Sequence, residues 1–238
     1  DLIDQISPLI SSLESPSGGL MNCALYKMYR EVSGDNVKVI LDSSGLDEIF
    51  GGYELHHLMY LKNLEKKNLN KYNKNINYFS KHWCIAEKDI KKKIDNLTSK
   101  KFLSIDGYNL TKNIVQKDLL KETLNKNHEE NNTDIKKSLI NYIQNTKIPR
   151  NNRLRDRSSM AHGLELRLPF LEHKLVEYAL SLPENFYFLL GRSKSILRDS
   201  VKGLMDNNTR LERKFSIQTP QTDWLVLEPI KNFVDEII

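Results

Sequence analysis

The stretch that decides the fold is Val37-Lys38-Val39-Ile40-Leu41-Asp42-Ser43-Ser44-Gly45-Leu46-Asp47-Glu48-Ile49-Phe50-Gly51-Gly52-Tyr53. Its opening, Val37 to Leu41, is short and rich in β-branched side chains, which is typical of a buried parallel strand. A turn of small residues, Asp42 to Gly45, follows, and an acidic helix start comes next at Asp47 and Glu48. The order strand, turn, helix places ligands at the carboxyl ends of strands. We therefore predict an α/β fold with a candidate site in this turn.

Asp47 and the glycines around it form the first candidate site. A carboxylate at the end of a strand can hold Mg²⁺ against a polyphosphate, because this ion prefers one or two protein carboxylates together with phosphate oxygens. Gly45, Gly51 and Gly52 would let a ligand approach the backbone closely. The alternative interpretation is structural: an acidic pair that favours the helix dipole, followed by a glycine-rich stop. The spacing supports both interpretations equally.

Most of the remaining chain shows the periodicity of amphipathic helices. We predict helices over residues 2–13, 20–32, 90–97, 114–124, 135–143, 172–182 and 193–205, and a final helix after Pro220 that carries Trp224, Leu225 and Phe233. Residues 54–150 are predicted to be mostly helical, with a loop over 125–133. The segment 165–171 is predicted to be extended and to end at a proline.

Two further groups of residues could carry chemistry. The segment beside Leu168-Pro169-Phe170-Leu171 holds a cluster that predicts a buried ion network: Asp156, Arg157, His162, Glu165 and Arg167. The alternative is a lattice of salt bridges that only holds the chain together. Lys214 is the third candidate, because a lysine can place a point charge on a phosphate or on a developing anion. Most lysines are merely solvated, so this residue needs further context.

Composition limits the classes of function. The chain has 36 Lys and Arg against 31 Asp and Glu, a net charge of +5, spread along a chain that is also rich in Asn. This pattern indicates solvated faces without interleaved aromatic residues, so we expect no nucleic-acid partner. No apolar run approaches the roughly 18 to 20 residues that span a bilayer, which excludes a transmembrane role.

The ends and the cysteines of the chain lead to two more expectations. No basic, hydrophobic leader opens the chain, and Cys23 and Cys84 are too few for a disulfide framework or a zinc site. A reducing, cytoplasmic setting is the expectation. Because the chain begins at Asp1 without methionine and closes at Ile238 within an amphipathic pattern, we expect it to be part of a longer protein.

Three stretches together resemble the synthetase domain of the asparagine synthetase family, the N-type ATP pyrophosphatases. Residues 37–53 resemble a strand followed by SGEGADELFGGY. Residues 156–171 resemble DRxSMAHSLEVRVPFLD. The third stretch resembles the closing pattern KxILR…RxK…P and consists of Ser193-Lys194-Ser195-Ile196-Leu197-Arg198, Arg213-Lys214 and Thr219-Pro220. The three occur in the family's order.

The resemblance implies a fold and an activity. The fold would be a partial adenine-nucleotide α-hydrolase-like, Rossmann-like domain over residues 1–238, with few parallel strands, a site segment at 37–53 and a substrate and nucleotide region at 153–220. In this family a carboxylate attacks the α-phosphate of Mg-ATP, which gives an acyl-adenylate and pyrophosphate, and an amine then displaces AMP. In asparagine synthetase the acid is aspartate, and the amine is ammonia from a glutamine-hydrolysing domain that this chain lacks.

The resemblance also implies roles for single residues. Asp47 would hold Mg²⁺ and pyrophosphate, with Gly45, Gly51, Gly52 and Arg167 at the nucleotide. The catalytic set would be Lys214, Glu165 and Ser44. Lys214 would stabilise charge on the α-phosphate and the adenylate, and Glu165 with Arg167 would shape the acid side of the cleft.

The chain departs from the family pattern at two places. Ser44 stands where the family has Glu, or Tyr in β-lactam-forming relatives, and a serine is no comparable general base without a partner. This departure favours a carboxylate other than aspartate, such as a sugar acid or a peptide. The family's pyrophosphate loop, SGGxDSS, belongs upstream. The segment Ser17-Gly18-Gly19-Leu20-Met21-Asn22-Cys23 mimics this loop, but it has Met21 in place of the aspartate and follows a helix, so we predict a turn there.

These departures leave three hypotheses. The first is an ATP-dependent, asparagine synthetase-like ligase, and the second is a related amidotransferase for another acid. The third, from a different class, is a non-catalytic binding module. On either enzymatic hypothesis, we expect the chain by itself to be inactive.

Overall fold

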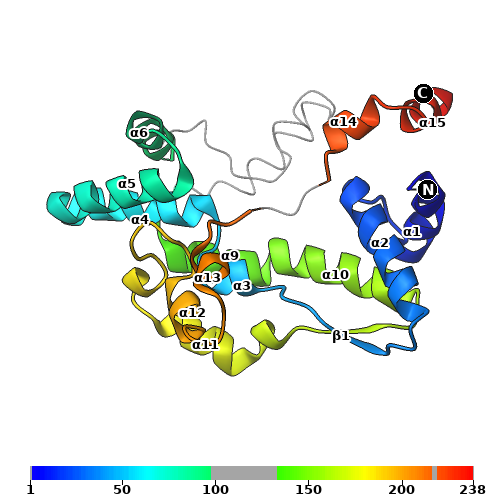
Figure 1. The fold of residues 1–238 in the computed structure, drawn as a ribbon, viewed down its shortest axis with the longest axis horizontal. Helices are drawn as coiled ribbons and strands as arrows, with labels where there is room; N and C mark the ends of the chain where they lie inside the picture. Colours follow the sequence, from blue (N-terminus) through cyan, green and yellow to red (C-terminus); the bar gives the residue numbers. More distant parts are fainter. Residues whose placement is uncertain (1, 98–132, 216–218, 238) are drawn as a thin grey trace. The chain divides into compact units, whose positions relative to one another are not determined.

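The computed structural model describes residues 2–97, 133–215 and 219–237 (Figure 1). The helix predicted over 114–124 and all but the last residue of the loop predicted over 125–133 lie outside these residues. The fold is α/β and mostly helical, with a small parallel sheet, as the sequence predicts. The chain divides into two units, each described below by itself: the first comprises Asp1–Gly45, Tyr142–Glu177 and Lys214–Ile238, and the second Leu46–Asn141 and Tyr178–Arg213.

The first unit is built around three helices that pack on one another. They are α1 (Ile6–Leu13), preceded by the 3-10 turn η1 (Ile3–Gln5), α2 (Leu20–Ser33) and α10 (Lys147–Met160). Leu9 and Leu13 of α1 form a small core with Cys23 and Tyr26 of α2. The long helix α10 also packs against the second strand of the sheet, so it joins the α1–α2 pair to the strand that carries the second motif.

The sheet of the first unit has two parallel strands, β1 (Val39–Leu41) and β2 (Glu165–Arg167). In its register Val39 pairs with Glu165 and Leu41 with Arg167. The predicted strand and its parallel pairing are confirmed, but the prediction that it is buried is wrong. Val39 is 38% exposed and Leu41 73% exposed. Alternate residues of a strand share a face, so the face with Val39 and Leu41 on β1 is open.

The second unit contains the larger hydrophobic core. Its helices are α3 (Leu46–Ile49), α4 (Glu54–Lys67), α5 (Leu69–Trp83), α6 (Glu87–Asn96), α12 (Ser195–Ser200) and α13 (Asn207–Leu211), with the 3-10 turn η3 (Glu184–Phe186). Helix α4 packs against α5 and α6 and buries an unbroken run from His56 to Leu61. Two helices, α9 (Ile135–Gln144) and α11 (His173–Ser181), have residues in both units.

Local capping explains where several helices begin. The Asn68 side chain accepts a hydrogen bond from the backbone N–H of Lys71 and so caps α5. The Asp206 carboxylate accepts from the backbone N–H groups of Asn208 and Thr209 at the start of α13. Asparagine and aspartate are preferred at this position because their oxygens satisfy helix N–H groups that have no partner within the helix.

Two predicted helices are longer than the real ones. The helix predicted over 193–205 is only α12, which ends at Ser200 before a turn. The predicted final helix is two helices, α14 (Gln221–Leu225) and α15 (Ile230–Ile237). Pro229 explains this second break, because proline has no N–H to donate and disfavours a helical conformation in the residue before it. Across the described ranges, no helix combines the length and apolar character needed to cross a membrane.

Candidate functional site

The turn after β1 is held by the carboxylate of Asp42. The backbone N–H of Asp42 donates to the carbonyl of Arg167 at 3.0 Å, which ties the turn to the end of β2. One carboxylate oxygen, Oδ1, accepts from the backbone N–H of Ser44 at 2.7 Å and from its hydroxyl at 2.6 Å. The other oxygen, Oδ2, forms an ion pair with Nη1 of Arg155 in α10. Asp42 therefore links Ser44 to helix α10, which packs against β2.

Gly45 brings this turn into contact with the second motif. Its φ of +99° lies in the region that favours glycine. A Cβ atom on Gly45 would lie 2.8 Å from Cγ of Leu171, within the 3-10 turn η2 (Pro169–Leu171). Gly45 is thus required both by the backbone conformation and by the close approach of Leu171. The first and second motifs meet here, although they are far apart in the sequence.

Glu165 and Arg167 form an exposed pair instead of the predicted buried network. Arg167 Nε donates to Glu165 Oε1 at 2.9 Å, and both side chains are more than half exposed. The hydrogen bond and charge of Arg167 lower the pKa of Glu165. The prediction of a buried ion network is wrong, because the residues of the predicted cluster have separate partners. Arg157 pairs with Glu14 at 2.8 Å, and the His162 ring packs edge-on against Tyr26.

In the second unit, the corner around Asp47 contains Lys194 and Gly52. Nζ of Lys194 lies 2.8 Å from Asp47 Oδ1, and the two side chains are only 18% and 22% exposed. The N–H of Gly52 donates to the backbone carbonyl of Asp47 at 2.8 Å, and a Cβ atom on Gly52 would overlap the Asp47 carboxylate. Gly51, with a φ of +65°, packs against Phe188. Gly52 therefore leaves room for the Asp47 carboxylate, whereas Gly51 leaves room for Phe188.

The third motif positions Lys194. This residue has a left-handed backbone, φ +55°, and directly precedes α12. Arg198 of α12 donates from Nε to the carbonyl of Ser193 at 2.8 Å and from Nη1 to the carbonyl of Arg210. Burial lowers the pKa of Arg198, and the charges of Arg192 and Arg210 act in the same direction. Arg198 thus fastens the loop that carries Lys194.

The donors at Asp47 limit how Mg²⁺ could bind. Within residues 2–97, 133–215 and 219–237, no group of three or more His, Cys, Asp or Glu side chains could hold a metal ion. An Mg²⁺ ion here would take one protein carboxylate and complete its shell from phosphate oxygens and water, which is a common arrangement for this ion. The donor set at Asp47 fits an ion that arrives with a polyphosphate, and the Lys194 ammonium adds positive charge beside it.

The predicted site residues divide between the two units. Ser44, Gly45, Glu165, Arg167 and Lys214 belong to the first unit, and Asp47, Gly51 and Gly52 belong to the second. Lys214 is partly buried. Within the first unit the turn at Ser44 and Gly45 meets the end of β2 at Arg167. The assembly of all eight residues into one site stays a prediction.

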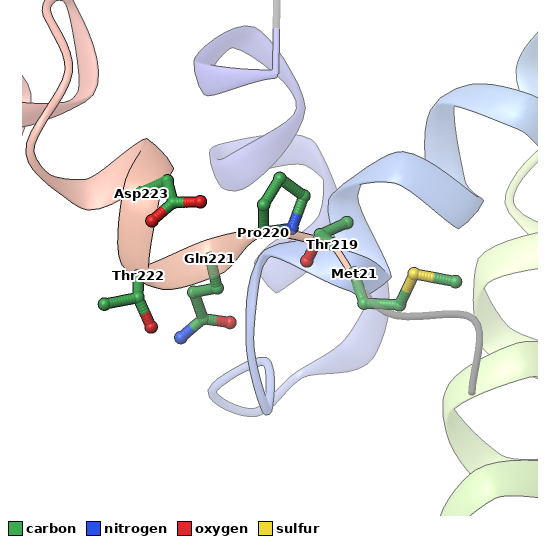
Figure 2. A pocket seen from close by; sticks show the side chains of 6 residues that line it. All are labelled: Met21, Thr219, Pro220, Gln221, Thr222 and Asp223. Carbon is green, nitrogen blue, oxygen red and sulfur yellow. The ribbon is translucent and has the colours of Figure 1, made fainter. Parts of the chain in front are cut away.

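In the segment that mimics a phosphate loop, the chain turns at Gly18 and Gly19, as predicted, and Leu20 to Cys23 already belong to α2. Gly19 has a φ of +133° and directly precedes α2. The N–H of Leu20 donates to the side-chain oxygen of Gln221 at 3.2 Å, so a side chain already takes this N–H at the start of α2. A pocket of about 410 Å³ lies beside this turn (Figure 2). It is lined by Met21, Thr219, Pro220, Gln221, Thr222 and Asp223. None of these is a predicted site residue or a cation.

Three residues of these clusters were not among the predicted site residues: Asp42, Arg155 and Lys194. Asp42 and Arg155 are separated by 113 positions, so no local pattern pairs them. The position of Asp42 at the carboxyl end of a parallel strand was the available signal. Lys194 lies within the third motif, and its position in that motif was the only available signal.

The fold and these turns define an α/β protein whose candidate site lies at the carboxyl end of a parallel strand. The family model described as asparagine synthase matches residues 1–238. The chain therefore belongs to the asparagine synthase family.

Curated relatives carry asparagine synthetase names. The chain is 26% identical over 215 residues to asparagine synthetase [glutamine-hydrolyzing] 3 of Bacillus subtilis, which covers 90% of this chain and 31% of that protein. It is 25% identical over 159 residues to a putative asparagine synthetase [glutamine-hydrolyzing] 1 of Methanocaldococcus jannaschii, which covers 67% of the chain and 17% of the relative. A stretch of 48 residues, 20% of the chain and 9% of the relative, is 50% identical to asparagine synthetase [glutamine-hydrolyzing] of Gallus gallus. The chain thus spans less than a third of the length of these relatives. No solved structure matches it significantly.

Proposed function

We propose that this chain is part of an ATP-dependent, amide-forming ligase that activates a carboxylate as an acyl-adenylate and releases pyrophosphate. The observation that carries the proposal is the match of the asparagine synthase family over residues 1–238. The packing of Gly45 against Leu171 supports it, because this contact joins two of the three motifs in space. Ammonia from a glutamine-hydrolysing domain or subunit would be the amine. Both cysteines are free thiols, which is consistent with a cytoplasmic setting.

The residues of the chain would contribute mainly positive charge and shape. Mg²⁺, held by Asp47, would neutralise charge on the polyphosphate. Lys194 lies 2.8 Å from Asp47 and would bind the same anion. Lys214 would stabilise negative charge on the α-phosphate as the acid attacks it. Gly52 would leave room for the Asp47 carboxylate beside the phosphates.

The identity of the acid depends on the turn at Ser44. Aspartate is the first candidate, because the relatives are named asparagine synthetases. Ser44 and its partner Asp42 favour the second candidate, another carboxylate such as a sugar acid or a peptide. Robust turnover of aspartate would remove this second candidate.

The test measures pyrophosphate release by the complete protein that carries this chain. ATP, Mg²⁺ and ammonia are supplied with a panel of acids: aspartate, sugar acids and peptides. We expect release that depends on one class of acid. Lys214→Ala should abolish this release with little change in the melting temperature.

The matched control is Lys231→Ala, which removes an exposed lysine of the same unit and should leave turnover unchanged. If Lys214→Ala turns over normally, Lys214 has no part in the mechanism. If no acid on the panel stimulates release by the wild-type protein, the proposed function is wrong.

A further inference from the structure

The pocket beside the start of α2 has a lining unlike that of a phosphate site. Its volume of about 410 Å³ lies within the range of roughly 300 to 1,000 Å³ that is usual for small-ligand sites. The lining combines hydroxyl, amide and carboxylate groups with two apolar side chains: Met21, Thr219, Pro220, Gln221, Thr222 and Asp223. Among these described residues none is Lys, Arg or His, so the lining would not neutralise a phosphate or a carboxylate. The group that fits this pocket is therefore uncharged or cationic.

The polar side chains of the pocket are available to a ligand. Across residues 2–97, 133–215 and 219–237, no hydrogen bond or ion pair engages the hydroxyls of Thr219 and Thr222 or the carboxylate of Asp223. The side-chain oxygen of Gln221 accepts from the N–H of Leu20 at 3.2 Å, which leaves its NH₂ group to donate. The lining thus offers two hydroxyls that donate or accept, one amide donor and one carboxylate acceptor.

A ligand with several hydroxyl groups would use all of these partners. A hydroxyl both donates and accepts, so a carboxylate can accept from two adjacent sugar hydroxyls while an amide N–H donates to a sugar oxygen. Figure 2 shows Thr222 and Asp223 on one side of the view and Met21 on the other. Met21 and Pro220 offer apolar surface to the C–H groups of a sugar ring. An ammonium group, in contrast, would use mainly Asp223 and leave the amide donor of Gln221 without a role.

The pocket follows Lys214 closely along the chain. Thr219 lies five positions after Lys214, and five residues of fully extended chain span at most about 18 Å. Both residues belong to the first unit, as does the turn at Ser44. This upper limit places the pocket in the neighbourhood of the lysine that is proposed to stabilise the adenylate.

We propose that this pocket binds the hydroxyl-bearing body of the acid substrate, and that the acid is a sugar acid; this inference rests on the proposed function. Asp223 and Thr222 bind sugar hydroxyls, the amide of Gln221 donates to a sugar oxygen, and Met21 contacts the ring. The charge of Asp223 repels the carboxylate of the sugar acid, which therefore points out of the pocket and is the group that becomes activated. These side chains bind and orient the acid and take no part in bond making.

The experiment measures pyrophosphate release by the complete protein with ATP, Mg²⁺, ammonia and one acid at a time. The sugar acids are glucuronate, galacturonate and gluconate, and aspartate is the comparison acid. We expect release with a sugar acid. Asp223→Asn keeps the shape of the side chain and should raise the KM for that acid about tenfold or more, because hydrogen bonds to a charged group are lost. The kcat and the KM for ATP should stay within about twofold of wild type, whereas a merely structural role would also change the KM for ATP and the melting temperature.

A second variant, a control and a binding measurement complete the test. Thr222→Val removes a hydroxyl at nearly constant shape and should raise the same KM about threefold or more. Asp235→Asn neutralises an exposed carboxylate of α15 that lies in the same unit but outside the pocket, and it should change none of these constants. Saturation-transfer NMR of the sugar acid, with Mg²⁺ and α,β-methylene-ATP present, should show weaker binding by Asp223→Asn than by wild type or Asp235→Asn.

Each contrary outcome identifies what is wrong. If the wild-type protein releases pyrophosphate with another acid but with none of the sugar acids, the pocket takes no sugar and the proposed function stands. If both pocket variants keep the wild-type KM for the sugar acid, the acid binds elsewhere. If Asp223→Asn weakens aspartate at least as much as the sugar acid, the carboxylate binds an ammonium group and the sugar assignment is wrong. If no acid stimulates release by the wild-type protein, the proposed function fails and this inference fails with it.

Discussion

The stability of the second unit should fall in acid because of one buried histidine. His57 of α4 is fully buried, with its ring centroid 4.6 Å from the rings of both Phe79 and Phe188. Neither ring nitrogen of His57 has a hydrogen-bond partner among the described residues. Burial lowers the pKa of His57 from 6.5 to about 3, and the charge of nearby His82 acts in the same direction. The folded unit therefore holds this ring neutral.

The sign and size of the effect follow from proton linkage. Between pH 6.5 and 3 the unfolded chain binds a proton at His57 and the folded unit does not. The stabilisation is complete above pH 6.5 and is lost as the pH falls towards 3. One pKa unit corresponds to about 1.4 kcal/mol, so the free energy of unfolding should drop by about 2 kcal/mol between pH 7 and 5. The total loss between pH 7 and pH 3 would be about 4 kcal/mol.

The assay follows urea unfolding of the second unit by the fluorescence of Trp83. This residue stacks on Phe79 of the same unit, and Trp224→Phe removes the other tryptophan of the chain. His57→Leu keeps the site apolar and should lose about 2 kcal/mol less than the parent between pH 7 and 5. Ile76→Val trims the same core without removing the titrating group, and it should keep the parent's pH dependence. If His57→Leu and its parent lose stability equally, burial of a neutral His57 does not cause the acid sensitivity.

The remaining predictions concern the corner around Asp47. Gly52→Ala should lower the acid-dependent exchange of labelled pyrophosphate into ATP about tenfold or more. The reason is that its methyl group would overlap the Asp47 carboxylate. Gly163→Ala is the control: its φ is +68° and nothing lies within 4 Å of the added atom, so it should cost about 1 kcal/mol of stability and leave exchange intact. Lys194→Met removes the lysine that pairs with Asp47 and should lower the unfolding free energy of the second unit by about 1 to 3 kcal/mol in the same urea assay. Lys202→Met, at an exposed lysine, should change it by no more than about 0.5 kcal/mol; equal losses would show that the Lys194 pair contributes nothing specific.

The sequence predicts the elements that depend on local patterns. The apolar run at 37–41 and the extended segment at 165–171 contain the two strands, and helical periodicity locates α1, α2, α6, α9 and α11. The periodicity predicts helices that are too long where the end of a helix depends on contacts with other parts of the chain. The helix predicted over 193–205 ends at Ser200 although apolar residues continue to Met205. Periodicity records which residues are apolar, not where the chain turns.

Several charged residues are harder to predict because their partners come from distant parts of the chain. Asp156, Arg157, His162, Glu165 and Arg167 are close in sequence, yet the expected buried network does not form. Arg157 pairs with Glu14, and Glu165 with Arg167 lies open to solvent. The ion pair of Asp42 with Arg155 was missed for the same reason. Proximity in sequence is consistent with the pair of Glu165 and Arg167, but it gives no sign of the partners that Arg157 and Asp42 find in Glu14 and Arg155.

The turn at Ser44 combines fixed backbone positions with one side chain that could vary. Gly45 is constrained by its backbone and by Leu171, and Asp42 by the carbonyl of Arg167 and the side chain of Arg155. Both constraints join the first motif to the second, so a change at either should disturb the sheet. Ser44, in contrast, is only partly buried, and its hydroxyl donates to Asp42. We expect that a different side chain at this one position would change the chemistry of the turn without moving the strands. We therefore predict that a substitution at position 44 changes which acid the protein uses, whereas substitutions at Asp42, Gly45 or Leu171 destabilise the turn.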